Sequence, residues 1–580
     1  MIKRLSKCIR EYKKDTILSP VFITGEVVVE CLIPFVIAEL VNQIQAGCSL
    51  STIASYGAIL VIMALVSLTF GALSGKFCAI ASCGFAKNLR HDLFYAVQKY
   101  SFSNIDKFSS SSLVTRLTTD VTNVQNAFMM IIRIAVRSPL MLIFSFTMTV
   151  IIDARLCLLF AVAIPLLAFG LYIIIKRAMP VFKSVFKKYD KLNNSVQENV
   201  NGMRVVKAYV REDYEISKFK SAADDVCSDF THAEKILAFN SPLMQFIIHS
   251  IIILLCLIGA KIIISTGATE LGVGDLSSLI VYGTQIFSSL MMLSMIFVMI
   301  SMAVESSKRI IEVLDEQSTV TNPKNPVMQV KDGSVTFNNV SFKYSADANK
   351  NALSNINLNI KSGETVGIIG GTGSSKSTLI QLIPRLYDTS EGEVYVGGVN
   401  VKDYDIKTLR DNVSVVLQKN VLFSGTIKEN LRWGNKDASD EEIERICKLA
   451  QADDFIESFP DKYDTFIEQG GSNVSGGQKQ RLCIARALLK KPKILILDDS
   501  TSAVDTKTDA LIRKAFRDEI PNTTKIIIAQ RIASVCDADK IVVMDNGQIS
   551  AVGTHSELMQ KSEIYREVYT SQNKAGDENA

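Results

Sequence analysis

The chain lacks paired cysteines and lacks a strong excess of charge of either sign. Its 11 cysteines are scattered along 580 residues without a CxxC pair, and several lie inside apolar runs. This pattern favours reduced thiols over disulfides or a thiolate metal site. The formal net charge of +4 is too small to indicate nucleic acid as a partner. We find neither a secretory signal peptide nor a low-complexity segment.

Apolar residues make up 48% of the chain, and the long apolar runs fall within the first 310 or so residues. The remainder has the composition of a soluble α/β domain. A helix needs about 20 apolar residues to cross a bilayer. The runs therefore predict six membrane spans, at residues 17–42, 53–82, 133–153, 155–176, 240–265 and 274–303.

The connections between these spans predict the orientation of the chain. Residues 45–54 contain no charged residue, and residues 266–273 lack Lys and Arg. Residues 83–132 and 177–239 are long and rich in Lys and Arg. Because basic loops stay on the cytosolic side, we expect a multi-pass protein of the cytoplasmic membrane, in contact with membrane lipid. Both termini and two long helical hairpins would lie in the cytosol.

A glycine-rich segment of the soluble part predicts a phosphate-binding loop. It follows an apolar strand, residues 365–369, and precedes an apolar helical run. Backbone N–H groups of such a loop can hold phosphate oxygens at a helix N-terminus. The predicted nucleotide-binding residues are Gly370, Gly371, Thr372, Gly373, Ser374, Ser375, Lys376, Ser377 and Thr378. The ligands we expect are ATP and Mg²⁺.

The residue types in this loop suggest separate roles. Lys376 would reach the β- and γ-phosphates, and the Ser377 hydroxyl would bind Mg²⁺. Ser375 stands where the usual pattern has glycine. If the backbone there has a positive φ, a side chain costs about 1–2 kcal/mol.

Two further motifs follow in the same domain. An apolar strand over residues 494–497 ends in Asp498 and Asp499. Asp498 is placed to hold Mg²⁺, and Asp499 stands where a carboxylate would orient the attacking water. About 20 residues upstream lies a short polar motif that would otherwise suggest a helix N-cap. Its residues are Ser475, Gly476, Gly477 and Gln478.

Together these motifs resemble the ATP-binding cassette family, and six spans followed by one cassette resemble its exporter half-transporters. The resemblance implies that Tyr344 stacks on adenine and that Gln418 senses Mg²⁺. It assigns Glu468 to the segment before the signature and residues 502–505, ending in Asp505, to the D-loop. Residues 113–121 and 197–207 resemble the two coupling helices. Two cassettes would sandwich two ATP molecules, each bound by one chain's loop and the other chain's Ser475–Gln478 signature.

Three departures from the family pattern fall in one site. Asp499 replaces the usual glutamate, Gln530 occupies the position of the switch histidine, and Ser375 replaces a glycine. The Ser475–Gln478 signature, which serves the opposite site, is intact. We therefore expect one half of a heterodimer, whose main hydrolysis occurs on the partner's loop. A homodimer with slow hydrolysis is the alternative.

The expected fold is a six-helix membrane bundle with long cytosolic extensions, followed by an α/β cassette. We expect a membrane domain at 1–318, a linker at 319–334, the cassette at 335–570 and a disordered tail at 571–580. Glu26 and Glu30 share a helical face. They either attract a cationic substrate or a proton, or they line an aqueous cavity or pair with Arg or Lys of a neighbouring helix. Met295 and Met299 suit an adaptable cavity or simple helix packing. The expected cargo is a small amphipathic compound. The alternatives are lipid or peptide export, and a non-hydrolysing regulatory or channel subunit.

Overall fold

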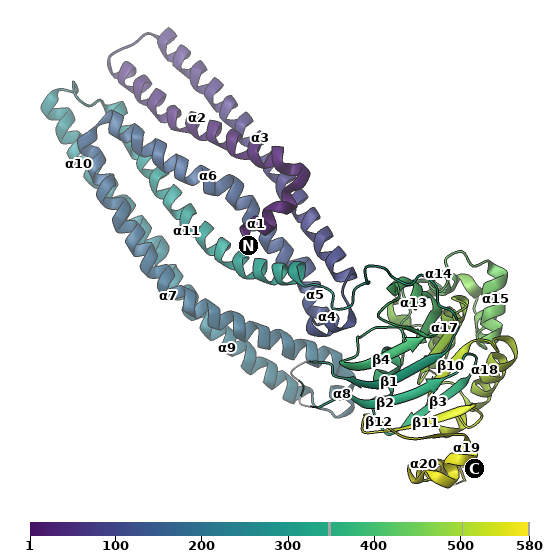
Figure 1. Ribbon diagram of the computed structural model, residues 1–580. Coiled ribbons are helices and arrows are strands. Elements are labelled where there is room, and N and C mark those ends of the chain that lie inside the picture. Colours follow the sequence, from purple (N-terminus) through teal and green to yellow (C-terminus); the bar gives the residue numbers. More distant parts are fainter. Residues whose placement is uncertain (346–347, 349, 501–502, 578–580) are drawn as a thin grey trace. The chain divides into compact units, whose positions relative to one another are not determined.

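The computed structural model describes residues 1–345, 348, 350–500 and 503–577. The chain divides into two compact units. The membrane unit comprises Met1–Gln98 and Ser110–Glu316, and the cassette unit comprises Lys99–Ser109 and Gln317–Ala580. Figure 1 shows the long helices of the first unit and the sheets of the second.

The membrane unit is built of long helices. Six helical segments among the described residues are long and apolar enough to cross a membrane, which confirms the prediction. Several continue well beyond the predicted spans (Figure 1). The helices are α1 (Ile2–Leu5), η1 (Ser6–Tyr12), α2 (Lys13–Gln45), α3 (Leu50–Gln98), α5 (Ser110–Thr115), η2 (Arg116–Asp120), α6 (Val121–Ile152), α7 (Ala154–Asn201), α8 (Met203–Ala208), α9 (Glu212–Ala238), α10 (Asn240–Thr266) and α11 (Val273–Asp315).

Helix ends and helix faces explain how this unit is held together. Asp153 caps α7, because its Oδ1 accepts hydrogen bonds from the backbone N–H groups of Arg155 at 2.7 Å and Leu156 at 3.2 Å. Such a cap satisfies donors that the first turn leaves free. Further along, apolar side chains of α7, α10 and α11 form a buried cluster that includes Phe160 and Leu255.

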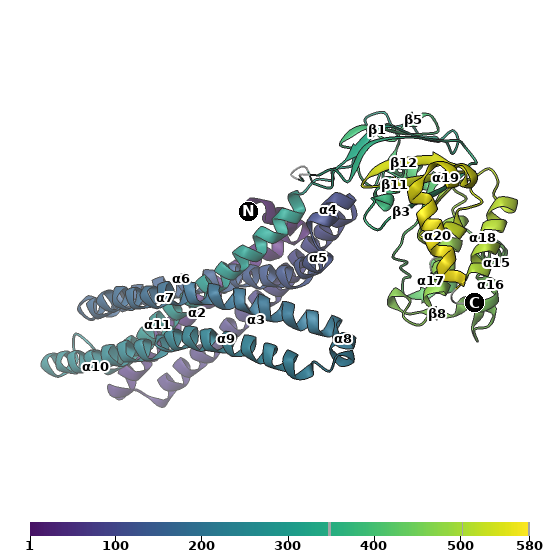
Figure 2. The ribbon, with the colours of Figure 1, turned by 90° about the horizontal axis from the view of Figure 1, so that it is seen from below.

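The cassette unit contains two main sheets (Figure 2). The antiparallel sheet has the order β2 (Leu353–Ile360), β1 (Val335–Phe342), β4 (Glu391–Val396), β5 (Val399–Asn400). The second sheet has the order β12 (Gln548–Gly553), β11 (Lys540–Asp545), β3 (Thr365–Gly370), β10 (Thr524–Ile528), β9 (Ile494–Asp498), β6 (Val413–Val416). All its neighbours are parallel except β11 and β12. A small antiparallel sheet pairs β7 (Gly425–Thr426) with β8 (Phe466–Ile467).

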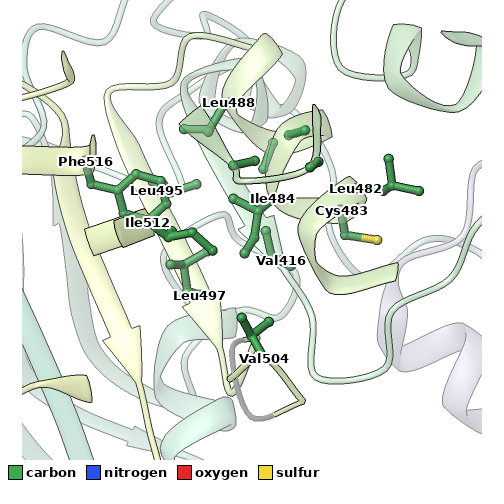
Figure 3. Close-up of a cluster of buried hydrophobic side chains, with 14 of the residues drawn as sticks. Val416, Leu482, Cys483, Ile484, Leu488, Leu495, Leu497, Val504, Ile512 and Phe516 are labelled. Carbon is green, nitrogen blue, oxygen red and sulfur yellow. The ribbon is translucent and has the colours of Figure 1, made fainter. Parts of the chain in front are cut away.

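Helices cover the second sheet and bury its apolar strands. Ile484 and Leu488 of α17 belong to one core with Leu495 and Leu497 of β9 (Figure 3). The helices of the unit are α4 (Phe102–Lys107), α12 (Lys376–Gln381), α13 (Ile406–Asn412), α14 (Ile427–Arg432), α15 (Asp440–Leu449), α16 (Asp453–Glu457), η3 (Lys462–Asp464), η4 (Gln469–Gly471), α17 (Gly476–Leu489), α18 (Thr506–Glu519), η5 (Ile532–Ser534), α19 (His555–Lys561) and α20 (Glu563–Asp577).

The C-terminal segment differs from the expectation of a disordered tail at 571–580. Helix α20 continues through this segment to Asp577, and residues 578–580 lie outside the described residues. The start of the helix is held in the core, because Tyr565 is fully buried. Packing of that first turn gives the helix an anchor that the polar composition of the tail does not reveal.

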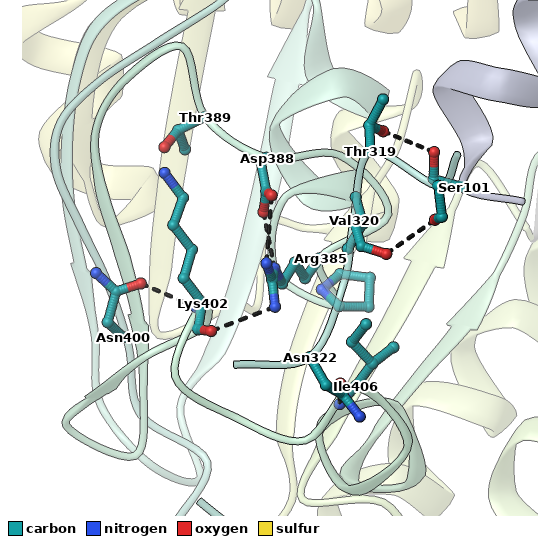
Figure 4. A network of polar contacts seen from close by, with 12 residues as sticks. Ser101, Thr319, Val320, Asn322, Arg385, Asp388, Thr389, Asn400, Lys402 and Ile406 are labelled. Atoms are coloured by element: carbon teal, nitrogen blue, oxygen red, sulfur yellow. Dashed lines mark hydrogen bonds and ion pairs between the residues drawn. The ribbon is translucent and has the colours of Figure 1, made fainter. Parts of the chain in front are cut away.

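Helix α4 belongs to the cassette unit although it is more than 200 residues from the rest of that unit in sequence. Tyr387 donates a hydrogen bond from Oη to Asp106 Oδ2 at 2.6 Å, and the Phe102 and Tyr387 rings meet edge to face at 6.0 Å. Just before α4, Ser101 Oγ lies 2.7 Å from Thr319 Oγ1 (Figure 4). A polar and aromatic contact therefore joins a segment between two membrane helices to the cassette.

Residues 113–121, which we predict to form the first coupling helix, are a separate segment from α4. Those residues lie in the membrane unit, in α5, in η2 and at the start of α6. There Asp120 is fully buried and accepts a hydrogen bond from Arg309 Nε at 2.8 Å, while Arg116 forms an ion pair with Glu312 at 2.9 Å. These contacts fasten η2 to α11 within the membrane unit.

Candidate nucleotide site and membrane charge cluster

The residues predicted to handle ATP lie at one edge of the second sheet. Gly370 ends β3 and Asp498 ends β9. Gln418 follows β6 by two residues, and Gln530 follows β10 by two. These strands are neighbours in the order β3, β10, β9, β6 and run parallel. Ligands of open α/β sheets bind at the carboxyl ends of the strands, so this edge is the candidate nucleotide site.

The phosphate-binding loop curls around its lysine. Lys376 Nζ donates to the carbonyl oxygens of Gly370 at 3.0 Å and Gly371 at 2.9 Å, and to Ser374 Oγ at 3.3 Å. Burial lowers the pKa of Lys376, because desolvation disfavours the ammonium. An anionic phosphate beside Nζ would reverse that cost. Gly370 is needed at the loop entrance, since a Cβ there would lie 2.2 Å from the carbonyl oxygen of Met544.

Ser375 has the left-handed backbone that the missing glycine suggests. Its φ is 66° and its ψ is 29°, directly before α12. A side chain is strained in this conformation, so the serine costs about 1–2 kcal/mol relative to an ordinary backbone position. The next glycine upstream, Gly373, also has a positive φ, of 84°, and no atom lies within 4 Å of the place that a Cβ would occupy.

The oxygen atoms expected to hold Mg²⁺ lie together. Ser377 donates from Oγ to Asp498 Oδ1 at 3.0 Å, and Asp498 is 4% exposed. Burial raises the pKa of the Asp498 carboxyl, and the neighbouring charge of Asp499 raises it further. Hydroxyl and carboxylate oxygens are the hard ligands that Mg²⁺ prefers. The donor set therefore fits Mg²⁺ held jointly with nucleotide phosphates.

Asp499 lies between two glutamine side chains. Its Oδ2 accepts a hydrogen bond from Gln530 Nε2 at 2.8 Å, and the Gln418 side chain is near enough to lower the pKa of the same carboxyl. Burial raises the pKa of Asp499, while Lys376 and the glutamine hydrogen bonds act in the opposite direction. The backbone of Asp499 is also left-handed, with φ 51°. Gln418 and Gln530, both predicted from the sequence, thus lie beside the carboxylate of Asp499.

Tyr344 contacts the helix that follows the loop, α12. The Tyr344 hydroxyl lies 2.9 Å from Thr378 Oγ1, and the side chain is 52% exposed. Its ring meets Phe342 and Tyr387 edge to face, with centroids 4.9 and 5.4 Å away. The exposed part of the ring is available for stacking on a base.

The predicted signature is also the N-cap of α17. Ser475 Oγ accepts from the Gln478 backbone N–H at 3.3 Å, and the Ser475 N–H donates to Gln478 Oε1 at 2.8 Å. Gly477 allows the start of α17 to lie close to the backbone of Ala503, since a Cβ on Gly477 would lie 2.8 Å from the Ala503 carbonyl oxygen. Ser475 and Gly476 are exposed. The cap therefore holds the motif in a fixed, accessible conformation.

The D-loop borders this motif. Asp505 caps α18 by accepting the Thr508 N–H at 2.9 Å, and hydrogen bonds from Thr508 lower the pKa of the Asp505 carboxyl. Ser502, at the start of the predicted D-loop, lies outside the described residues.

In the membrane unit, Glu26 and Glu30 share one guanidinium. Arg137 Nη1 donates to Glu26 Oε1 at 2.5 Å, and Arg137 Nη2 donates to Glu30 Oε2 at 2.7 Å. This agrees with the interpretation that the carboxylates pair with a basic residue. Glu26 is 6% exposed, and its Oε2 has no hydrogen-bond partner among the described residues. The guanidinium of Arg137 on α6 is thus shared by the carboxylates of Glu26 and Glu30 on α2.

Two cavities adjoin this charge cluster. Glu30 lines one of 350 Å³ between α2 and α11, and Arg137 lines one of 430 Å³ between α6 and α11; Gln285 lines both. Met295 is 56% exposed and Met299 is half-buried, and neither lines these two cavities. The methionines at the second cavity are Met129, Met141 and Met292.

Comparison with known proteins decides the family. Residues 16–290 match the ABC transporter transmembrane region, and residues 353–502 match the ABC transporter domain. An uncharacterized ABC transporter ATP-binding protein of Bacillus subtilis (strain 168), YfiB, is 36% identical over 94% of each chain. The chain belongs to the ABC transporter family. A second protein of that organism, the uncharacterized ABC transporter ATP-binding protein YfiC, is 30% identical over 98% of this chain and 94% of its own.

A solved structure agrees on the fold. The chain resembles a bacterial Atm1-family ABC exporter with ATP bound, with a TM-score of 0.83 and 24% identity over 97% of this chain and 98% of that one. This ABC transporter is therefore a multi-pass membrane protein with a cytosolic cassette. The cassette is of the ATPase type that drives transport, and its donor set suits ATP with Mg²⁺.

Proposed function

We propose that this chain is one half of a heterodimeric exporter whose two ATP sites are unequal. The observation that carries the proposal is the grouping of Ser375, Asp499 and Gln530 around the chain's own loop, while its Ser475–Gln478 signature keeps a capped, exposed conformation. This chain would hold ATP on its own loop and would complete a competent site on the loop of a second half-transporter.

The geometry at Asp499 supports slow hydrolysis at the chain's own site. An aspartate is one methylene shorter than the glutamate it replaces, and a misplacement of about 1 Å can cost roughly 100-fold in rate. The carboxylate also accepts a hydrogen bond from Gln530. Gln530 can donate a hydrogen bond to a γ-phosphate, but it cannot carry the charge of an imidazolium.

The cavities of the membrane unit support a small amphipathic cargo. They combine apolar side chains such as Ile33 and Met292 with polar groups such as Gln285 and Arg133. Ligand sites of this size range are mostly apolar with a few polar groups that fix orientation. ATP binding and hydrolysis would shift the halves between inward-open and outward-open states through the different ATP affinities of those states.

Two other functions have specific support. A homodimer is compatible with Asp499, because burial raises its pKa toward that of a usable base. A regulatory, non-hydrolysing subunit is compatible with the strained loop. ATPase activity in lipid vesicles separates the three: the heterodimer requires a partner chain with glutamate after its Mg²⁺ aspartate. The homodimer turns over alone, and the regulatory subunit supports no turnover with any partner.

A further inference from the structure

The C-terminal helix reaches the switch position with one side chain. Gln572 of α20 donates from Nε2 to the Gln530 carbonyl oxygen at 2.7 Å. Its Oε1 accepts the Ile532 backbone N–H at 2.9 Å. The two bonds fall on either side of Arg531, so a single amide holds the backbone as a neighbouring β-strand would.

Helix α20 is fixed to the core at its other end. Tyr565 is fully buried, and its hydroxyl lies 2.7 Å from His555 Nδ1 of α19. The rings of His555 and Tyr569 lie 5.2 Å apart. Tyr565, Tyr569 and Gln572 are four and three residues apart and so share one helical face. The anchored aromatic end therefore sets where the Gln572 amide lies.

The contact of Gln572 with the switch segment consists of hydrogen bonds and lies at the edge of a cavity. A cavity of 740 Å³ is lined by Gln530, Arg531, Cys536, Tyr569 and Gln572, among others. The amide accordingly adds little apolar packing. Gln572 itself is exposed, so replacing it leaves the core unchanged.

The hydrogen bonds continue from Gln572 into the nucleotide site. Gln572 fixes the backbone of Gln530, whose side chain donates to Asp499 at 2.8 Å. We propose that Gln572 is a positioning residue for nucleotide sensing: it holds the switch segment so that Gln530 can contact the γ-phosphate, which ADP lacks. This inference rests on the proposed role of Gln530.

The test measures how well the full-length chain in lipid nanodiscs distinguishes Mg-ATP from Mg-ADP, by equilibrium binding of each nucleotide. For Gln572→Ala we expect the affinity for ATP to fall about fivefold, the equivalent of about one net hydrogen bond, with ADP affinity and Tm unchanged. Alanine favours helix at least as well as glutamine, so a loss of helix is not the cause. Gln572→Glu keeps the acceptor for Ile532 and loses the donor to Gln530, and we expect it to reduce ATP affinity as well.

Ser571→Ala is the matched control, on the adjacent exposed position of α20, and should leave both affinities unchanged. The inference is overturned if Gln572→Ala lowers ATP and ADP affinities equally or changes neither, while the unaltered protein prefers ATP. If the unaltered protein shows no preference for ATP over ADP, the proposed role of Gln530 fails and this inference fails with it.

Discussion

Gln530 donates a hydrogen bond from Nε2 to Oδ2 of Asp499 over 2.8 Å. Both residues replace the types that the family usually has at these positions, and here they bind each other. A glutamine suits this contact, since its neutral amide donates to a carboxylate without transferring a proton. Gln530 therefore holds the carboxylate in place through a neutral hydrogen bond.

The left-handed Ser375 gives a prediction about stability. Ser375→Gly removes the strain of a side chain at φ 66°, although glycine also adds entropy to the unfolded chain. The net expectation is a gain of up to about 1 kcal/mol in stability, seen as a higher Tm of the nucleotide-free protein. Thr372→Gly is the control, because Thr372 has no positive φ and should gain nothing. Equal effects of the two substitutions would argue against strain at Ser375.

Arg137 gives a prediction about the membrane unit. Arg137→Ala leaves Glu26 and Glu30 without this counter-charge. Loss of one partner of a fully buried pair costs about 3–5 kcal/mol, and this partly buried cluster should lose less. We expect low yield and a lowered Tm in detergent. Adding Glu26→Gln and Glu30→Gln to Arg137→Ala should restore much of the loss. A triple variant as unstable as Arg137→Ala alone would show that the charge pairing is not the cause.

Burial of Asp498 predicts a pH dependence of nucleotide binding. Its pKa is raised above 3.8, and Mg²⁺ binding requires the ionised carboxylate. Mg-ATP affinity should therefore fall as pH falls toward the raised pKa. Over the same interval the nucleotide-free protein gains stability from this group, because the folded state binds the proton more tightly than the unfolded state.

Calorimetric titrations across the acid range check this dependence. Asp498→Asn removes the titrating group and should make the remaining affinity, though weak, less sensitive to pH. A pH profile identical in the two proteins would contradict the assignment of Asp498.

The sequence predicts well whatever a local pattern encodes. The apolar runs located the six spans, and the order of strand, loop and helix around Lys376 located the phosphate-binding loop. The positive φ of Ser375 followed from a motif that normally has glycine there. In each case the physical cause lies within a few neighbouring residues.

Contacts between segments that lie far apart along the chain could not be predicted from the sequence. Arg137 is 107 residues from Glu30, so no spacing rule connects them. Helix α4 joins the cassette through Asp106 and Tyr387, 281 residues apart. Gln572 lies in a polar tail whose composition suggests disorder. Each depends on tertiary packing, which a single sequence does not display.

The most direct measurement is ATPase activity in lipid vesicles for this chain with its partner half-transporter, comparing Ser475→Ala with Asp499→Asn in this chain. We predict that Ser475→Ala abolishes turnover, since the partner's site loses its signature serine, and that Asp499→Asn changes turnover little. The heterodimer proposal is contradicted if this chain alone hydrolyses ATP well and Asp499→Asn abolishes that activity, because Asp499 would then be a working catalytic residue.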